Sequence, residues 1–171
     1  QSGASIGTLA PILAAALFLF SAIACLQQTI AFYVQDFLGV DAREAAQATG
    51  YCFMVLATAT LIAQGGLVQV FKPGPYVLLG MGMPIIAVGL FVYAAAPTFY
   101  GIILGCALLG LGFGLANPGL AAAASLRTGA DAQGATAGLM QAAMSAGFIF
   151  GPLGGTALYE RGPLLAVSFA S

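Results

Sequence analysis

Residues 105–159 read GCALLGLGFGLANPGLAAAASLRTGADAQGATAGLMQAAMSAGFIFGPLGGTALY, two glycine-rich apolar stretches joined by a short polar turn. Glycine recurs about every four residues in both stretches, so bare backbone lies along one face of each predicted helix. A glycine costs a helix in water about 1 kcal/mol relative to alanine, whereas in lipid small residues let helices approach closely. The spacing therefore predicts two membrane helices with the packing residues Gly110, Gly114, Gly147, Gly151 and Gly155.

Each of these two predicted helices contains one proline near its middle, Pro118 in the first and Pro152 in the second. A proline removes the hydrogen bond to the residue four positions earlier and kinks the helix there. Such breaks occur in membranes where a neighbouring helix or a water-lined cavity satisfies the freed carbonyl. The simpler interpretation of both prolines is a packing kink, and the alternative is a moving hinge.

The composition indicates an all-α integral membrane protein. Hydrophobic residues make up 61% of the 171 residues and charged residues 5%, against about a quarter charged in soluble domains. About 20 helical residues cross the bilayer core. The apolar runs therefore predict five complete spans and the start of a sixth at residue 163, the five being about residues 9–38, 45–71, 76–96, 98–126 and 132–159.

Several classes of function find no support in the sequence. The chain has no histidine, no basic run and a net charge of −1, so nucleic-acid binding is not expected. No pair of titratable residues falls at membrane depth, and no set of metal ligands occurs, so we expect neither an enzyme nor a cofactor. Cys25, Cys52 and Cys106 each fall inside a predicted span, and an odd count without paired spacing favours small apolar fillers over disulfides.

The first predicted span is the most polar and supplies candidates for a solute cavity. Gln27 and Gln28 point about 100° apart on a helix, so we expect one to contact a neighbouring helix and the other to face a cavity. Phe32 shares the face of Gln28, and a glutamine in mid-membrane needs a partner or water. The alternative role of these glutamines is to hold helices together by interhelical hydrogen bonds. Asp36, about one turn inside the end of this span, is a candidate proton carrier or an interfacial anchor.

The later spans differ in polarity. Asn117 precedes Pro118 on the stripe of Gly110 and Gly114, so its amide either faces a solute or caps a carbonyl that the proline frees. Gln141 is the cavity candidate of the fifth predicted span. The third predicted span contains no Gln, Asn, Ser or Thr and has tyrosines only near its ends, which predicts a helix that faces lipid.

A unit of three spans recurs in the order of its landmarks. Pro11, Asp41-Ala42, Gly65-Gly66 and Lys72-Pro73 correspond to Pro97, Asp131-Ala132, Gly154-Gly155 and Arg161-Gly162-Pro163, at offsets of 86, 90, 89 and about 89 residues. Three spans are an odd number, so consecutive units take opposite orientations in the membrane, as in the inverted repeats of secondary transporters. The second unit lacks most of its third span, and the chain looks cut at its start because no methionine begins it.

Three segments resemble, in order, the tenth and eleventh helices of the major facilitator superfamily. They are GFGLANPG at residues 112–119, DAQGATAG at 131–138 and GPLGG at 151–155. FYVQD at residues 32–36 looks like the end of the family's seventh helix. The family's Gly-x-Leu-x-Asp-Arg loop appears only as GGLVQV at 65–70, with Gln69 in place of the acid, which favours the C-terminal six-helix half of the fold. Within the family, the chain is most similar to bacterial drug:proton antiporters of the tetracycline-efflux type.

The resemblance implies half of a twelve-helix fold whose N-terminal half is absent from this chain. It implies that the first and fourth predicted spans line a central cavity, that the second and fifth flank the interface between halves, and that the third faces lipid. The expected function is secondary transport of a small organic solute, with proton-coupled drug or multidrug efflux across the bacterial inner membrane as the specific form. The alternatives are an uptake permease for a sugar or metabolite, and a membrane scaffold that transports nothing. The expected partners are the lipid bilayer, the missing half, a small-molecule substrate and protons.

Overall fold

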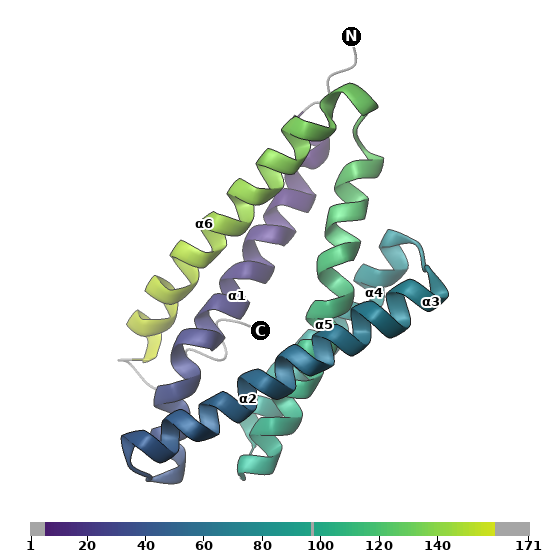
Figure 1. Ribbon diagram of the computed structural model, residues 1–171. Helices are drawn as coiled ribbons and strands as arrows, with labels where there is room; N and C mark the ends of the chain where they lie inside the picture. The colour runs from purple at the N-terminus through teal and green to yellow at the C-terminus, as the bar shows by residue number, and fades with distance from the viewer. Residues whose placement is uncertain (1–5, 97, 160–171) are drawn as a thin grey trace.

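The computed structural model describes residues 6–96 and 98–159, and every regular element within them is a helix (Figure 1). The prediction of an all-α protein is therefore confirmed for this part of the chain. In chain order the elements are α1 (Ile6–Leu38), α2 (Ala42–Ile62), the π-helix η1 (Ala63–Val68), α3 (Gln69–Phe71), α4 (Pro75–Ala95), α5 (Phe99–Leu126), the 3-10 turn η2 (Ala130–Ala132) and α6 (Gln133–Tyr159).

Four helical segments within the described residues are long and apolar enough to cross a membrane. They are Leu9–Gln28, Ala42–Phe71, Pro75–Ala95 and Phe99–Leu126. α6 is not one of these four, and the glutamines Gln133 and Gln141 lie in its first half. The fifth complete span therefore stays a prediction, and the expected sixth span from residue 163 lies outside the described residues.

Local sequence signals set the boundaries of the helices. Asp41 caps α2, because its Oδ1 accepts hydrogen bonds from the amides of Arg43 at 2.9 Å and Glu44 at 2.8 Å. Gly39, at a φ of 62°, ends α1 in the left-handed conformation that glycine tolerates best. Lys72 also has a positive φ, of 43°, and closes α3 before the prolines of the next turn.

The helices form two groups that diverge from the turn between α5 and α6 (Figure 1). α1 and α6 run side by side in the same direction, and α4 and α2 pack on α5. α2 and α5 run opposite to α1 and α6 (Figure 1). α4 buries Leu78, Ile86, Leu90 and Tyr93 and exposes Phe91 on its other side.

Tyr93 contradicts the expectation that the tyrosines of α4 face the membrane surface. Its side chain is fully buried and stacks on Tyr33 of α1, with ring centroids 5.0 Å apart. One face of α4 is exposed as predicted, but the other packs closely on α5. An apolar composition alone does not distinguish a face covered by lipid from a face covered by a helix, which explains the wrong prediction for Tyr93.

Glycines bring α5 onto α2 at one crossing. A Cβ added at Gly110 would meet the carbonyl oxygen of Leu56, and one at Gly114 would lie 2.8 Å from the carbonyl oxygen of Thr60. The Thr60 hydroxyl donates a hydrogen bond to the Gly110 carbonyl oxygen at 3.0 Å. α2 therefore touches α5 backbone to backbone.

The crossing of α6 on α1 has a similar construction. A Cβ added at Gly147 would lie 2.8 Å from the carbonyl oxygen of Leu17, and one at Gly151 would meet that of Ser21. Ser21 and Gly110 are 89 residues apart, and Thr60 and Gly151 are 91 apart. These separations are close to the offsets between the repeated landmarks of the sequence.

Pro118 and Pro152 lie inside the continuous helices α5 and α6. Gly155 lies in the last turns of α6, and its surroundings are outside the described side chains.

Candidate functional site

A cleft of about 420 Å³ lies between the ends of α5 and α6 that meet at their connecting turn. This volume falls within the range of about 300–1,000 Å³ that is typical of small-molecule sites. We call it the α5–α6 cleft. Its lining residues are Ala121, Ala124 and Ser125 of α5, and Gln133, Thr136, Ala137, Met140, Gln141 and Met144 of α6.

The cleft exists because neighbouring helices draw α5 and α6 apart. The glycine face of α5 with Gly110 and Gly114 packs on α2, whereas Gly147 and Gly151 of α6 pack on α1. α5 and α6 contact each other only sparsely, although a short turn joins them. The glycine faces of α5 and α6 therefore pack on different helices, and the sides of α5 and α6 that face each other stay apart.

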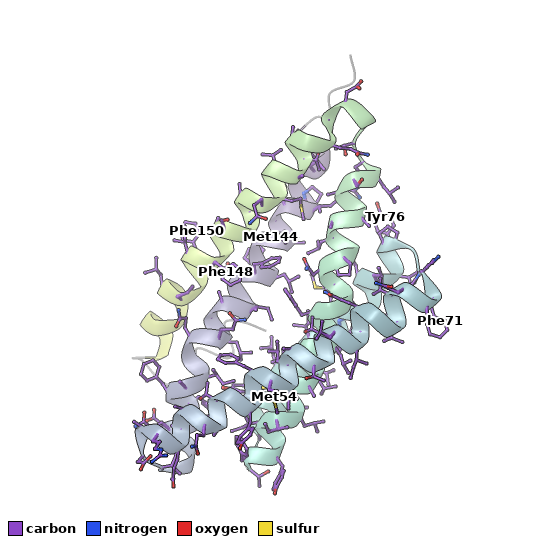
Figure 2. The ribbon with its side chains drawn as sticks, viewed as in Figure 1. Met54, Phe71, Tyr76, Met144, Phe148 and Phe150 are labelled. Atoms are coloured by element: carbon purple, nitrogen blue, oxygen red, sulfur yellow. The ribbon has the colours of Figure 1, made fainter. Side chains whose placement is uncertain are left out.

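The helix faces that line the cleft continue beyond it, away from the turn between α5 and α6. On α5, Asn117 lies four residues before Ala121, and Phe113 lies four residues before Asn117. On α6, Phe148 lies four residues after Met144. Residues four apart share a face of a helix. Figure 2 shows Met144 and Phe148 along α6, with Phe150 on the side away from α5.

Three phenylalanines meet beyond the deep end of the cleft. Phe20 of α1 makes an edge-to-face contact with Phe113 of α5, with centroids 5.5 Å apart at 79°, and a tilted contact with Phe148 of α6 at 5.7 Å. Phe20 is buried, Phe113 is half-buried, and Phe148 is 47% exposed. We call Phe20, Phe113 and Phe148 the aromatic cluster.

The lining of the α5–α6 cleft combines alanine and methionine side chains with four polar, uncharged residues. The amides of Gln133 and Gln141 can donate and accept hydrogen bonds, as can the hydroxyl of Ser125. The Thr136 hydroxyl bonds back to the Ala132 carbonyl oxygen at 3.1 Å. Among the residues that the structure describes, no group of three or more His, Cys, Asp or Glu could hold a metal ion. The cleft can therefore bind polar and apolar groups by hydrogen bonds and packing.

The structure places some of the predicted cavity residues together and others elsewhere. Gln141 lines the cleft, and the half-buried Asn117 lies one turn from Ala121 on the same face of α5. Gln27, Gln28 and Phe32 are exposed on the second half of α1, outside the lining of the cleft.

The candidate proton carrier, Asp36, lies far from the α5–α6 cleft. Asp36 is exposed near the end of α1 at Leu38. That end lies at the opposite end of the molecule from the turn between α5 and α6 (Figure 1).

Sequence reasoning missed Ser125, Gln133, Met140, Met144 and the aromatic cluster. A signal for part of this set was present, since Gln133 and Gln141 lie eight residues apart on one face of α6. The opposing wall could not be inferred from that pattern, because it depends on how α5 and α6 are placed by α1 and α2.

A larger cavity, of about 550 Å³, lies between α2 and α5. Its lining is apolar apart from Thr58, and it includes Met54, which Figure 2 labels on α2. A lining with one hydroxyl offers a solute few orienting contacts, so this cavity is a weaker candidate than the smaller α5–α6 cleft.

The comparisons with known proteins agree with the membrane-spanning helices. No curated protein matches the chain, and no solved structure matches it. The family model described as Major Facilitator Superfamily matches residues 4–152, which is most of the 171 residues. Members of this family are membrane transporters, and the chain belongs to the major facilitator superfamily.

Proposed function

We propose that the protein carries a small organic solute across the membrane by secondary transport, and that the α5–α6 cleft lies on the path of the solute. The observation that carries this proposal is the cleft itself, where Gln133, Gln141 and Ser125 gather between helices that are otherwise apolar. Gln133 and Gln141 are exposed on the surface of α6, and an amide at membrane depth is costly unless a partner or water meets it. A solute path supplies both.

The proposed architecture is the C-terminal six-helix half of a twelve-helix transporter, built from inverted three-helix repeats. Two features support the repeats. α2 and α5 run opposite to α1 and α6 (Figure 1). Corresponding residues of the two glycine crossings, Ser21 with Gly110 and Thr60 with Gly151, lie 89 and 91 residues apart along the chain. In this plan the N-terminal half of the transporter closes the cavity from the other side.

The proposed specific form is proton-coupled efflux of drug-like compounds from a bacterial cell, across its inner membrane. The sequence segments at 112–119, 131–138 and 151–155 support it through their similarity to drug:proton antiporters. Uptake of a sugar or metabolite is the second transport function. Gradient-driven flux in both directions, measured with the complete transporter in proteoliposomes, separates efflux from uptake.

Water access tests the solute path against a scaffold that only holds helices together. After Cys25, Cys52 and Cys106 are replaced by alanine, Gln141→Cys and Asn117→Cys are treated with a small, membrane-impermeant thiol reagent. A solute path predicts labelling at both positions and protection by a transported solute. The matched control is Phe91→Cys on the lipid side of α4, where the native side chain is 72% exposed and no water is expected. Absence of labelling at Gln141→Cys and Asn117→Cys would favour the scaffold.

A further inference from the structure

We propose that the α5–α6 cleft binds an uncharged solute that carries an aromatic ring, with the ring directed toward Phe20, Phe113 and Phe148 and the hydrogen-bonding groups toward Gln141, which lies two helical turns, about 10 Å, from Phe148 along α6. This inference rests on the proposed transport function and names the class of its solute. It follows from three properties of the described residues: the absence of charged side chains in the lining, the aromatic cluster one helical turn beyond Met144, and the order of polar and apolar side chains along α6.

The lining selects against ions. A charge in a low-dielectric site needs an opposite charge or a full set of hydrogen bonds. The side chains that line the cleft are amides, hydroxyls, thioethers and methyl groups, without Asp, Glu, Lys or Arg. Gln141 and Gln133 can bond to an amide, hydroxyl or carbonyl of a solute without a proton or counter-ion.

The aromatic cluster next to the cleft selects for a flat apolar group. Phe20 is enclosed by its contacts with Phe113 and Phe148, but Phe148 remains 47% exposed, so part of its ring is available to another ring. Aromatic rings prefer edge-to-face and offset contacts with centroids about 4.5–7 Å apart, and the cluster already has this geometry.

The side chains between mouth and aromatic cluster set the orientation. Met140 is buried and Met144 is half-buried, and both line the cleft on the way from Gln133 to Phe148. Thioethers make favourable contacts with aromatic rings and adapt to their shape. A solute therefore meets hydrogen-bonding amides in the cleft, then the methionine thioethers, and then the aromatic cluster.

The test uses tryptophan as a local reporter, because the chain contains none. Phe148→Trp places it in the aromatic cluster. Phe150→Trp is a second reporter that leaves Phe20, Phe113 and Phe148 native, since residue 150 lies about 200° around the helix from 148 and its native side chain is 62% exposed. The probes are N-phenyl-1-naphthylamine, which is uncharged, and 8-anilino-1-naphthalenesulfonate, which adds a sulfonate to the same ring system. Both accept excitation energy from tryptophan.

In the purified protein in lipid nanodiscs, without other tryptophans, the neutral probe is expected to lower the emission of the Phe148→Trp variant along a saturating curve. Because energy transfer reaches across a helix that is about 10–12 Å wide, the Phe150→Trp variant should show a saturating loss with a similar midpoint. The sulfonate probe should give no saturating loss in either variant. Adding Phe113→Leu to Phe148→Trp should weaken the apparent affinity several-fold.

Equal, non-saturating curves for the two reporters would overturn the aromatic site, and a saturating curve with the sulfonate probe would overturn the uncharged class. Either result leaves transport standing if Gln141→Cys is labelled from water and protected by a transported solute. An unlabelled Gln141→Cys would remove the proposed transport path instead.

Discussion

Gly110 and Gly50 show how differently two helix glycines can be used. Gly110 faces the carbonyl oxygen of Leu56 across the crossing of α5 and α2, whereas a Cβ at Gly50 would have nothing within 4 Å. Gly110→Ala should therefore destabilise the protein by about 1–3 kcal/mol through overpacking. Gly50→Ala should be neutral or stabilising by up to about 1 kcal/mol, because alanine is the better helix former. Thermal unfolding of both variants in detergent measures the contrast, and similar melting temperatures would contradict the crossing.

Asn117 has two roles that substitution can separate. Its side chain is half-buried, one turn from Ala121 in the α5–α6 cleft. If the amide binds solute, Asn117→Ala should weaken solute binding while the melting temperature stays near that of the native protein. If it caps a backbone carbonyl near Pro118, the same variant should lose about 1–3 kcal/mol of stability. Solute affinity and thermal unfolding, measured on one preparation, decide between the roles, and unchanged affinity would remove Asn117 from the site.

Asp36 lies away from the α5–α6 cleft that we propose as the solute path. It is exposed near the end of α1, at the opposite end of the molecule from the turn between α5 and α6 (Figure 1). Asp36→Asn is therefore expected to leave proton-driven transport by the complete transporter largely intact. Uptake into proteoliposomes under an imposed pH gradient measures it. Loss of pH-driven transport with unchanged solute binding would identify Asp36 as the proton carrier.

At the scale of elements, the last part of the second span has an unexpected conformation. Residues Ala63–Val68 form a π-helix, in which the amide of Gln69 bonds to the carbonyl oxygen of Gln64, five residues earlier. Gly65 and Gly66 lie in this segment, and a Cβ at either would have nothing within 4 Å. These glycines are therefore not required for close packing, unlike Gly110. Two glycines favour the helix less than two alanines would, and π-helical turns are frequent at functional sites.

The double variant Gly65→Ala with Gly66→Ala should strengthen this segment. Each alanine favours regular helix by up to about 1 kcal/mol, so the amides of residues 63–71 should exchange their hydrogens more slowly than in the native protein. Hydrogen exchange read by mass spectrometry measures this, and Gly50→Ala serves as the control because it lies earlier, in the regular part of α2. Unchanged exchange in 63–71, or equal slowing there in the control, would show that the glycines do not weaken the π-helix.

At the scale of the whole molecule, the α5–α6 cleft reaches the surface, since Gln133, Ala137 and Gln141 of its lining are exposed. Its walls come from two helices that diverge from one turn (Figure 1), and the proposed transporter closes them with its other half. The 171-residue chain reconstituted alone is therefore expected to show no substrate-specific, gradient-driven flux. Proteoliposome transport assays test this, with the complete transporter as the positive control. Flux from the 171 residues alone would show that the cavity needs no second half.

Local properties of the sequence were enough to predict the class of the protein. An all-helical membrane chain follows from long apolar runs with few charges, because each helix must satisfy its own backbone in lipid. The cap at Asp41 was also predictable, since its hydrogen bonds reach only Arg43 and Glu44. The similarity of residues 112–119 to the transporter family pointed to the superfamily that the family model then matched over residues 4–152.

Only the tertiary structure decided which surfaces meet. The spacing of Gly110 and Gly147 marks faces for close approach, but nothing local specifies that the first meets α2 and the second meets α1. The cleft depends on that choice, because those pairings separate the sides of α5 and α6 that face each other. The same holds for the contacts of Phe20 with Phe113 and Phe148. Each of these contacts joins residues from different helices that are far apart in sequence. An apolar side chain can pack against lipid or against another helix, so only the arrangement of the helices decides which one it contacts.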